Sequence, residues 1–186
     1  MQVRPLMTED FMGASSHAPA PAELSERSSS IAIDGVFSGV IGGLTVALFY
    51  LLIDSIEGRP LWTPSLLGSA LFLGSSVDKV AEVNVPMVFA YTGVHMAMFV
   101  AAGMVFSFMV AQFESNPPLA VLLILLFVCF EAAFFAFTMA LAPGVIGALG
   151  ASSVAVANLL AALAMSAYFW RTHPGAGRGL SKIWDD

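Results

Sequence analysis

Charged residues are scarce in this sequence. Only 11% of the 186 residues are Asp, Glu, Lys or Arg, whereas 58% are hydrophobic, and a soluble domain carries about 25% charged residues. A chain this apolar cannot bury its side chains in one small core, so we expect a lipid bilayer to surround much of it. The net charge of −6 leaves no basic patch for a nucleic acid, so we expect no nucleic-acid partner.

Cysteine and catalytic motifs are also nearly absent. The single cysteine, Cys129, excludes an internal disulfide framework and any CxxC metal or redox motif. It lies in an apolar run and reads as a small buried hydrophobe. The sequence has no GxSxG, HExxH, GxxxxGK or GxGxxG motif in the required context. These absences argue against hydrolases, zinc proteases and nucleotide-binding proteins, and we expect no enzymatic activity.

Long apolar runs are what the sequence does contain. Four of them reach the length of about 20 residues that a membrane-spanning helix needs. A fifth, shorter helix is expected after Thr63–Pro64, which reads as an N-cap followed by a first-turn proline, and it would be interfacial or re-entrant. The sequence therefore predicts an all-α fold, a transmembrane four-helix bundle. The expected spans are 31–53, 86–112, 117–142 and 146–170, with the short helix over 64–73.

Polar segments flank this membrane domain, which covers residues 31–174. Residues 1–30 read as a disordered tail rich in Ser, Ala and Pro, and residues 175–186 as a polar C-terminal tail. Four of the seven Lys and Arg residues lie in the tails, a fifth, Arg171, directly follows the fourth span, and two lie in the loop after the first span. The positive-inside rule then places both termini in the cytoplasm.

The first span carries a glycine ridge made of Gly35, Gly39 and Gly43, two overlapping GxxxG motifs. Helices in lipid associate through close packing and hydrogen bonds, and small residues let two backbones approach. The ridge is expected to pack within the chain or, alternatively, against another chain. The fourth span offers a matching small face, formed by Gly147, Ala151 and Ala155.

Polar residues at membrane depth are the candidate site. Glu131 falls near the middle of the third span, in the apolar run "LLFVCFEAAFF", and Asn158 near the middle of the fourth. His95 lies about one turn from the middle of the second span. These residues can meet inside one bundle. The same cluster would include Tyr91 and Thr92 beside His95, and Asp34 near the membrane surface on the first span.

Glu131 needs a partner or a proton, because an ionised carboxylate in hydrocarbon costs roughly 3 kcal/mol on insertion scales. His95 is the better expected partner, since a neutral imidazole offers one donor and one acceptor; Asn158 is the other. One interpretation is that these residues form buried hydrogen bonds between helices, which fix the register of the helices. The alternatives are a proton-titrating or ligand-binding site, or a glutamate that another subunit satisfies.

Redox cofactors find little support. A b-type haem held by two histidines needs a second histidine within the membrane, and His173 lies beyond the fourth span. The methionines around His95 read as apolar filling rather than copper ligands. We therefore expect no metal and no cofactor.

Two stretches, "EGRPLWTPSLLGSALF" after the first span and "ANLLAALAMSAYFWRTHP" at the end of the fourth, resemble small bacterial four-span membrane proteins with no assigned function. His95 in "YTGVHMAMF" is part of the likeness, which covers about residues 31–174. The resemblance implies a bacterial inner-membrane protein and no particular activity.

Three functions remain open from the sequence. The first is a non-enzymatic accessory or structural subunit that packs against other membrane subunits or a second copy. The second is a small proton-coupled transporter or channel that uses Glu131, His95 and Asn158. The third, an electron-transfer subunit, is the weakest because of the histidine count.

Overall fold

The computed structural model describes residues 21–115, 128, 131–132, 135–136, 138–139 and 144–172. Within these residues the chain is helical and contains no strand, which confirms the all-α prediction for this part. The elements in chain order are α1 (Pro21–Ile56), α2 (Trp62–Leu73), the 3₁₀ turn η1 (Val77–Lys79), α3 (Val85–Ser115), α5 (Val145–Leu149) and α6 (Ala151–Thr172).

Three helices are long and apolar enough to cross a membrane, over Ser29–Ile56, Val85–Gln112 and Ala151–Thr172. They correspond to the expected first, second and fourth spans. Most of the expected third span, 117–142, lies outside the described residues. Its seven described residues, which include Val128 and Glu131, are all helical. The fourth helix of the bundle therefore stays a prediction.

Two boundaries differ from the sequence-based expectation. Helix α1 begins at Pro21, so residues 21–30 are helical and not part of a disordered tail. Proline is favoured in the first turn of a helix, where its missing N–H costs nothing. The expected fourth span is broken at Gly150 (φ 78°, ψ 119°), which ends α5 one residue before α6 begins. Glycine adopts this backbone conformation without the penalty a side chain would impose.

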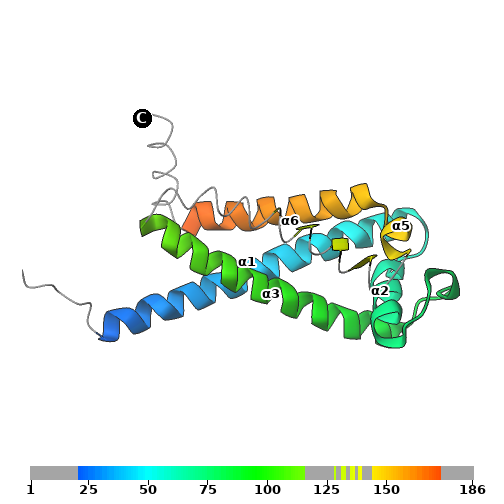
Figure 1. The fold of residues 1–186 in the computed structure, drawn as a ribbon, viewed down its shortest axis with the longest axis horizontal. Coiled ribbons are helices and arrows are strands. Elements are labelled where there is room, and N and C mark those ends of the chain that lie inside the picture. The colour runs from blue at the N-terminus through cyan, green and yellow to red at the C-terminus, as the bar shows by residue number, and fades with distance from the viewer. Residues whose placement is uncertain are drawn as a thin grey trace, which may run out of the picture.

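Helix α1 is the centre of the described bundle, with α3 and α6 packed against it (Figure 1). The glycine ridge faces α3. A Cβ on Gly35 would lie 2.6 Å from the Cα of Met104, and a Cβ on Gly39 would clash with the carbonyl oxygen of Phe99. From the other side, a Cβ on Gly103 would meet the backbone of Gly35 and Gly39. The ridge therefore packs within the chain, backbone against backbone.

Helix α6 meets α1 through side chains. Val154, Ala157 and Ala161 form a buried cluster with Val46 and Tyr50 of α1. The small face expected on the fourth span lies elsewhere and does not meet the glycine ridge. Gly147 belongs to α5 and has nothing within 4 Å of an added Cβ, and both Ala151 and Ala155 are exposed.

The short helix α2 lies at one end of the bundle, near α5 (Figure 1). It begins at Trp62, two residues before the predicted start, and ends at Leu73 as expected. Its twelve residues are too few to span a bilayer. Gly68 of α2 packs so closely on α3 that an added Cβ would overlap the backbone of Met87. The helix therefore caps the bundle and fixes the ends of α1 and α3.

Candidate functional site

His95, the central residue of the predicted polar cluster, bonds to a backbone group. Its Nε2 lies 3.1 Å from the carbonyl oxygen of Gly43 in α1. Because a carbonyl only accepts, Nε2 must carry the hydrogen. The imidazole ring lies between the rings of Tyr91 and Phe99, with centroid distances of 5.7 and 4.8 Å. His95 thus joins α3 to α1 and is not bonded to Glu131.

Glu131 is joined to Asn158. The amide Nδ2 of Asn158 donates to the Oε2 of Glu131 at 2.8 Å, and both side chains are partly buried. The other carboxyl oxygen, Oε1, is buried and has no hydrogen-bond partner in the described part of the chain. The two residues thus connect α6 to the segment of the expected third span, and Oε1 of Glu131 remains without a hydrogen bond to the described residues.

Asp34 of α1 is hydrogen-bonded to a tyrosine of α6. The hydroxyl of Tyr168 in α6 donates to its Oδ1 at 2.8 Å. One turn earlier on α1, the carbonyl oxygen of Ile31 accepts a bond of 2.8 Å from the hydroxyl of Ser107 in α3. Thr92, by contrast, bonds to the carbonyl oxygen of Val88 in its own helix. The expected single cluster is therefore divided into pairs that each link two helices, with Thr92 outside them.

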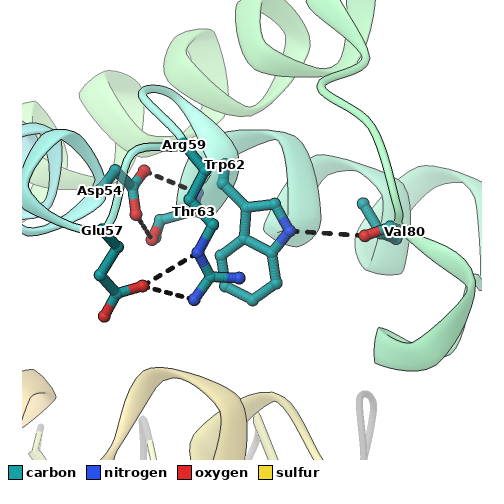
Figure 2. Close-up of polar contacts among 6 residues, drawn as sticks. All are labelled: Asp54, Glu57, Arg59, Trp62, Thr63 and Val80. Atoms are coloured by element: carbon teal, nitrogen blue, oxygen red, sulfur yellow. Dashed lines mark hydrogen bonds and ion pairs between the residues drawn. The ribbon is translucent and has the colours of Figure 1, made fainter.

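A different set of polar residues gathers where α1 turns into α2. Asp54 is only 1% exposed. Its carboxylate accepts a bond of 2.8 Å from the backbone N–H of Thr63 and one of 2.7 Å from the Thr63 hydroxyl (Figure 2). Thr63 was the expected N-cap of α2, but Leu61 occupies that position, in the left-handed conformation with φ 67°. Asp54 therefore caps α2 from the end of the preceding helix.

Arg59 covers this corner from the outside. It forms an ion pair with Glu57, with Nε 2.9 Å from Oε2, and its guanidinium lies 3.7 Å above the centre of the Trp62 ring. The indole N–H of Trp62 donates to the carbonyl oxygen of Val80 at 3.4 Å (Figure 2). The ion pair is half exposed and stabilises the protein little, but the stack on Trp62 shields one side of the corner.

A cavity of about 20 Å³ lies at this corner between α1, α2 and α5. Such a volume is too small for an organic substrate. Within the described residues, no group of three or more His, Cys, Asp or Glu side chains could hold a metal ion. The lining residues are Tyr50, Ile53, Asp54, Glu57, Arg59, Trp62, Thr63, Ala148 and Leu149.

Sequence reasoning missed Asp54, which was not among the candidate site residues. The available signal was an acidic residue at the end of an apolar helix, followed within nine residues by Thr63–Pro64 at the start of the next. Tyr168 and Ser107 were also missed, because polar residues near the helix ends carry no strong signal in an apolar sequence.

Comparison of the chain with protein-family models, with curated proteins and with solved structures finds no match. The function is therefore argued from the helices and their polar contacts alone.

Proposed function

We propose that the chain is an integral membrane protein without enzymatic activity that packs as an accessory subunit in a larger membrane complex. The main support is that polar side chains in the described helices form hydrogen bonds to neighbouring helices. His95, Asn158 and Tyr168 each bond across to another helix. Side chains engaged in this way stabilise a fixed arrangement of helices and are not free to line a path for a solute.

The outer faces of the helices also favour this proposal. Large apolar side chains on α1 and α3 are exposed, including Phe37, Leu48, Phe89, Met98 and Phe108. Lipid or the helices of other subunits would cover them. We place the protein in a bacterial inner membrane with both termini in the cytoplasm, on the basis of the sequence resemblance and the distribution of Lys and Arg.

A small proton-coupled transporter is the second candidate, and one observation favours it. Glu131 Oε1 is buried without a hydrogen-bond partner in the described part. A carboxyl group that is only half satisfied at membrane depth is a candidate for proton exchange. Such a transporter would have to be an oligomer to enclose a path, since so few helices surround little space.

Native purification separates the two candidates. The tagged full chain is extracted from its own membrane in a mild detergent, and the mass and composition of the complex are measured. An accessory subunit is expected to co-purify with other subunits in a fixed stoichiometric ratio. A homo-oligomer with pH-dependent flux in proteoliposomes would contradict the proposal.

Glu131→Gln is the matched variant for this experiment. Its side-chain oxygen still accepts the bond from Asn158, but glutamine cannot exchange a proton. The accessory proposal expects the same complex, in the same ratio, from the variant as from the unmodified chain. The transporter candidate expects flux to be abolished while the protein stays folded.

A further inference from the structure

An open groove lies beside α2, where the loop that carries η1 leads into α3 (Figure 1). It is lined by the end of α2, by Ser75, by residues 79–84 and by the first two residues of α3. Its volume is about 690 Å³, and sites that hold small molecules in proteins measure roughly 300–1,000 Å³. The groove is therefore large enough for a small molecule or for the headgroup of a lipid.

The wall formed by the loop is fixed to α2 by two hydrogen bonds. The indole N–H of Trp62 donates to the carbonyl oxygen of Val80 at 3.4 Å. Further along the loop, the hydroxyl oxygen of Ser65 accepts a bond of 2.8 Å from the backbone N–H of Asn84. Because these bonds hold the loop at both of its ends, the groove is formed before any ligand enters it.

The groove lies at the level of the lipid headgroups. It includes Val85, the residue at which the 28-residue apolar stretch of α3 begins. A helix of this length measures about 42 Å, which matches a bilayer with its headgroup regions included. Leu73, Val83 and Val85 line the groove and are exposed apolar side chains. The groove thus joins polar residues of the loop to a surface that acyl chains can cover.

The groove contains one charge of each sign. Lys79 and Glu82 both line it, and both are exposed. In the described part of the chain neither forms an ion pair, whereas Arg59 is paired with Glu57. A lysine ammonium only donates hydrogen bonds, and an ionised carboxylate only accepts them. The complementary ligand therefore carries an anionic acceptor and a cationic donor.

We propose that this groove binds the headgroup of a phospholipid of the ethanolamine type. The ammonium of Lys79 donates to the lipid phosphate, and the primary ammonium of the lipid donates to the carboxylate of Glu82. The acyl chains lie against Leu73 and Val85. A headgroup with only negative charge would be repelled by Glu82, and a choline headgroup has no N–H to donate. The proposal rests on the membrane location proposed above, but not on the role as an accessory subunit.

Lipid selection by the purified full chain tests the site. The protein is exchanged into an equimolar mixture of phosphatidylethanolamine, phosphatidylcholine and phosphatidylglycerol with identical acyl chains, and native mass spectrometry counts the bound lipids. Phosphatidylethanolamine should bind roughly two- to fivefold better than phosphatidylcholine, the ratio that one exposed ion pair provides. Equal binding of these two lipids, or stronger binding of phosphatidylglycerol than of either, would overturn the proposal.

Three single variants separate the two contacts. Glu82→Gln should remove the preference for phosphatidylethanolamine over phosphatidylcholine, and Lys79→Gln should weaken the binding of all three lipids, because all three carry the phosphate. Asp78→Asn is the matched control, since Asp78 is exposed beside Lys79 but does not line the groove; it should change nothing. The same loss in all three variants would show that the charge of the loop, and not the groove, selects the lipid.

Failure of this site is distinguishable from failure of the function proposed above. Lys79→Gln should leave the subunits that co-purify with the chain, and their ratio, as they are in the unmodified protein. A variant that loses both its lipids and its partner subunits would show that Lys79 belongs to a protein interface, and the lipid site would then be wrong.

Discussion

The two interfaces of α1 are built differently. Against α3, the contact is made by Gly35, Gly39 and Gly103, so that the two backbones touch. Against α6, the contact is made by side chains such as Val154 and Ala161, which pack on α1 in a buried cluster. One helix therefore presents a rigid surface to one neighbour and a deformable surface to the other.

This difference decides where the fold tolerates change. A backbone cannot move aside locally, so an added methyl group between α1 and α3 must separate the helices. A side chain can change its rotamer, and methionine does so easily because it is unbranched. We therefore expect substitutions at the α1–α3 interface to destabilise the protein more than the same substitutions at the α1–α6 interface.

The largest effect is expected for Gly39→Ala. Its new Cβ would clash with the backbone of Phe99 and Val100, so the variant should lose about 3 kcal/mol of unfolding free energy or fail to fold. The control is Gly93→Ala in α3, where an added Cβ has nothing within 4 Å; it should leave stability unchanged or raise it slightly. Equilibrium unfolding in mixed detergent micelles measures both. Equal effects of the two variants would show that the ridge is not a contact.

Asp54→Ala should have the next largest effect, because α2 holds the ends of α1 and α3. The variant removes both bonds to Thr63 and should cost about 2 kcal/mol. Hydrogen exchange of the amides in the first turn of α2 is the direct readout and should become faster. Ser55→Ala is the control, since Ser55 is exposed and bonds only within its own helix. If exchange in α2 stays as slow as in the unmodified chain, Asp54 is not its cap.

Gly42→Ala examines the adaptable interface with the same chemical change as Gly39→Ala. Its new Cβ would lie 2.6 Å from the sulfur of Met165, which can move, so the cost should be about 1 kcal/mol. In a Met165→Ala background, where the sulfur is gone, Gly42→Ala should cost less than it does in the unmodified chain. A cost as large as that of Gly39→Ala would remove the distinction between the two interfaces.

The smallest effect is expected for His95→Phe, which keeps a ring between Tyr91 and Phe99 but loses the bond to the carbonyl oxygen of Gly43. Hydrogen bonds between membrane helices contribute about 0.6 kcal/mol on average. The same unfolding experiment should give a loss of this size. A loss comparable to that of Gly39→Ala would mean that the imidazole has a further role.

Much of this arrangement could be predicted from the sequence. The length of the apolar runs predicted the helices at Ser29–Ile56, Val85–Gln112 and Ala151–Thr172. The GxxxG spacing predicted the glycine ridge on α1. The helix that fills the ridge was not predictable, because many helices present small residues. It is α3, through Gly103, and not the small face of the fourth span.

The polar pairs were predictable only in part. Asn158 was one of the two partners expected for Glu131, and the structure joins them. His95 was expected to be the better partner, but it bonds to a backbone carbonyl. Every helix residue carries such a carbonyl, so residue types along the chain do not reveal which one a side chain will reach.

The pair of Glu131 and Asn158 provides the most direct test of the claim that polar residues at membrane depth hold helices together. The measurement is a double-mutant cycle of unfolding free energies with Glu131→Ala, Asn158→Ala and the double variant, plus Glu131→Gln. The account predicts a coupling of about 0.6–1.7 kcal/mol between the two positions and a Glu131→Gln variant as stable as the unmodified chain. Additive losses, with no coupling between the positions, would contradict it.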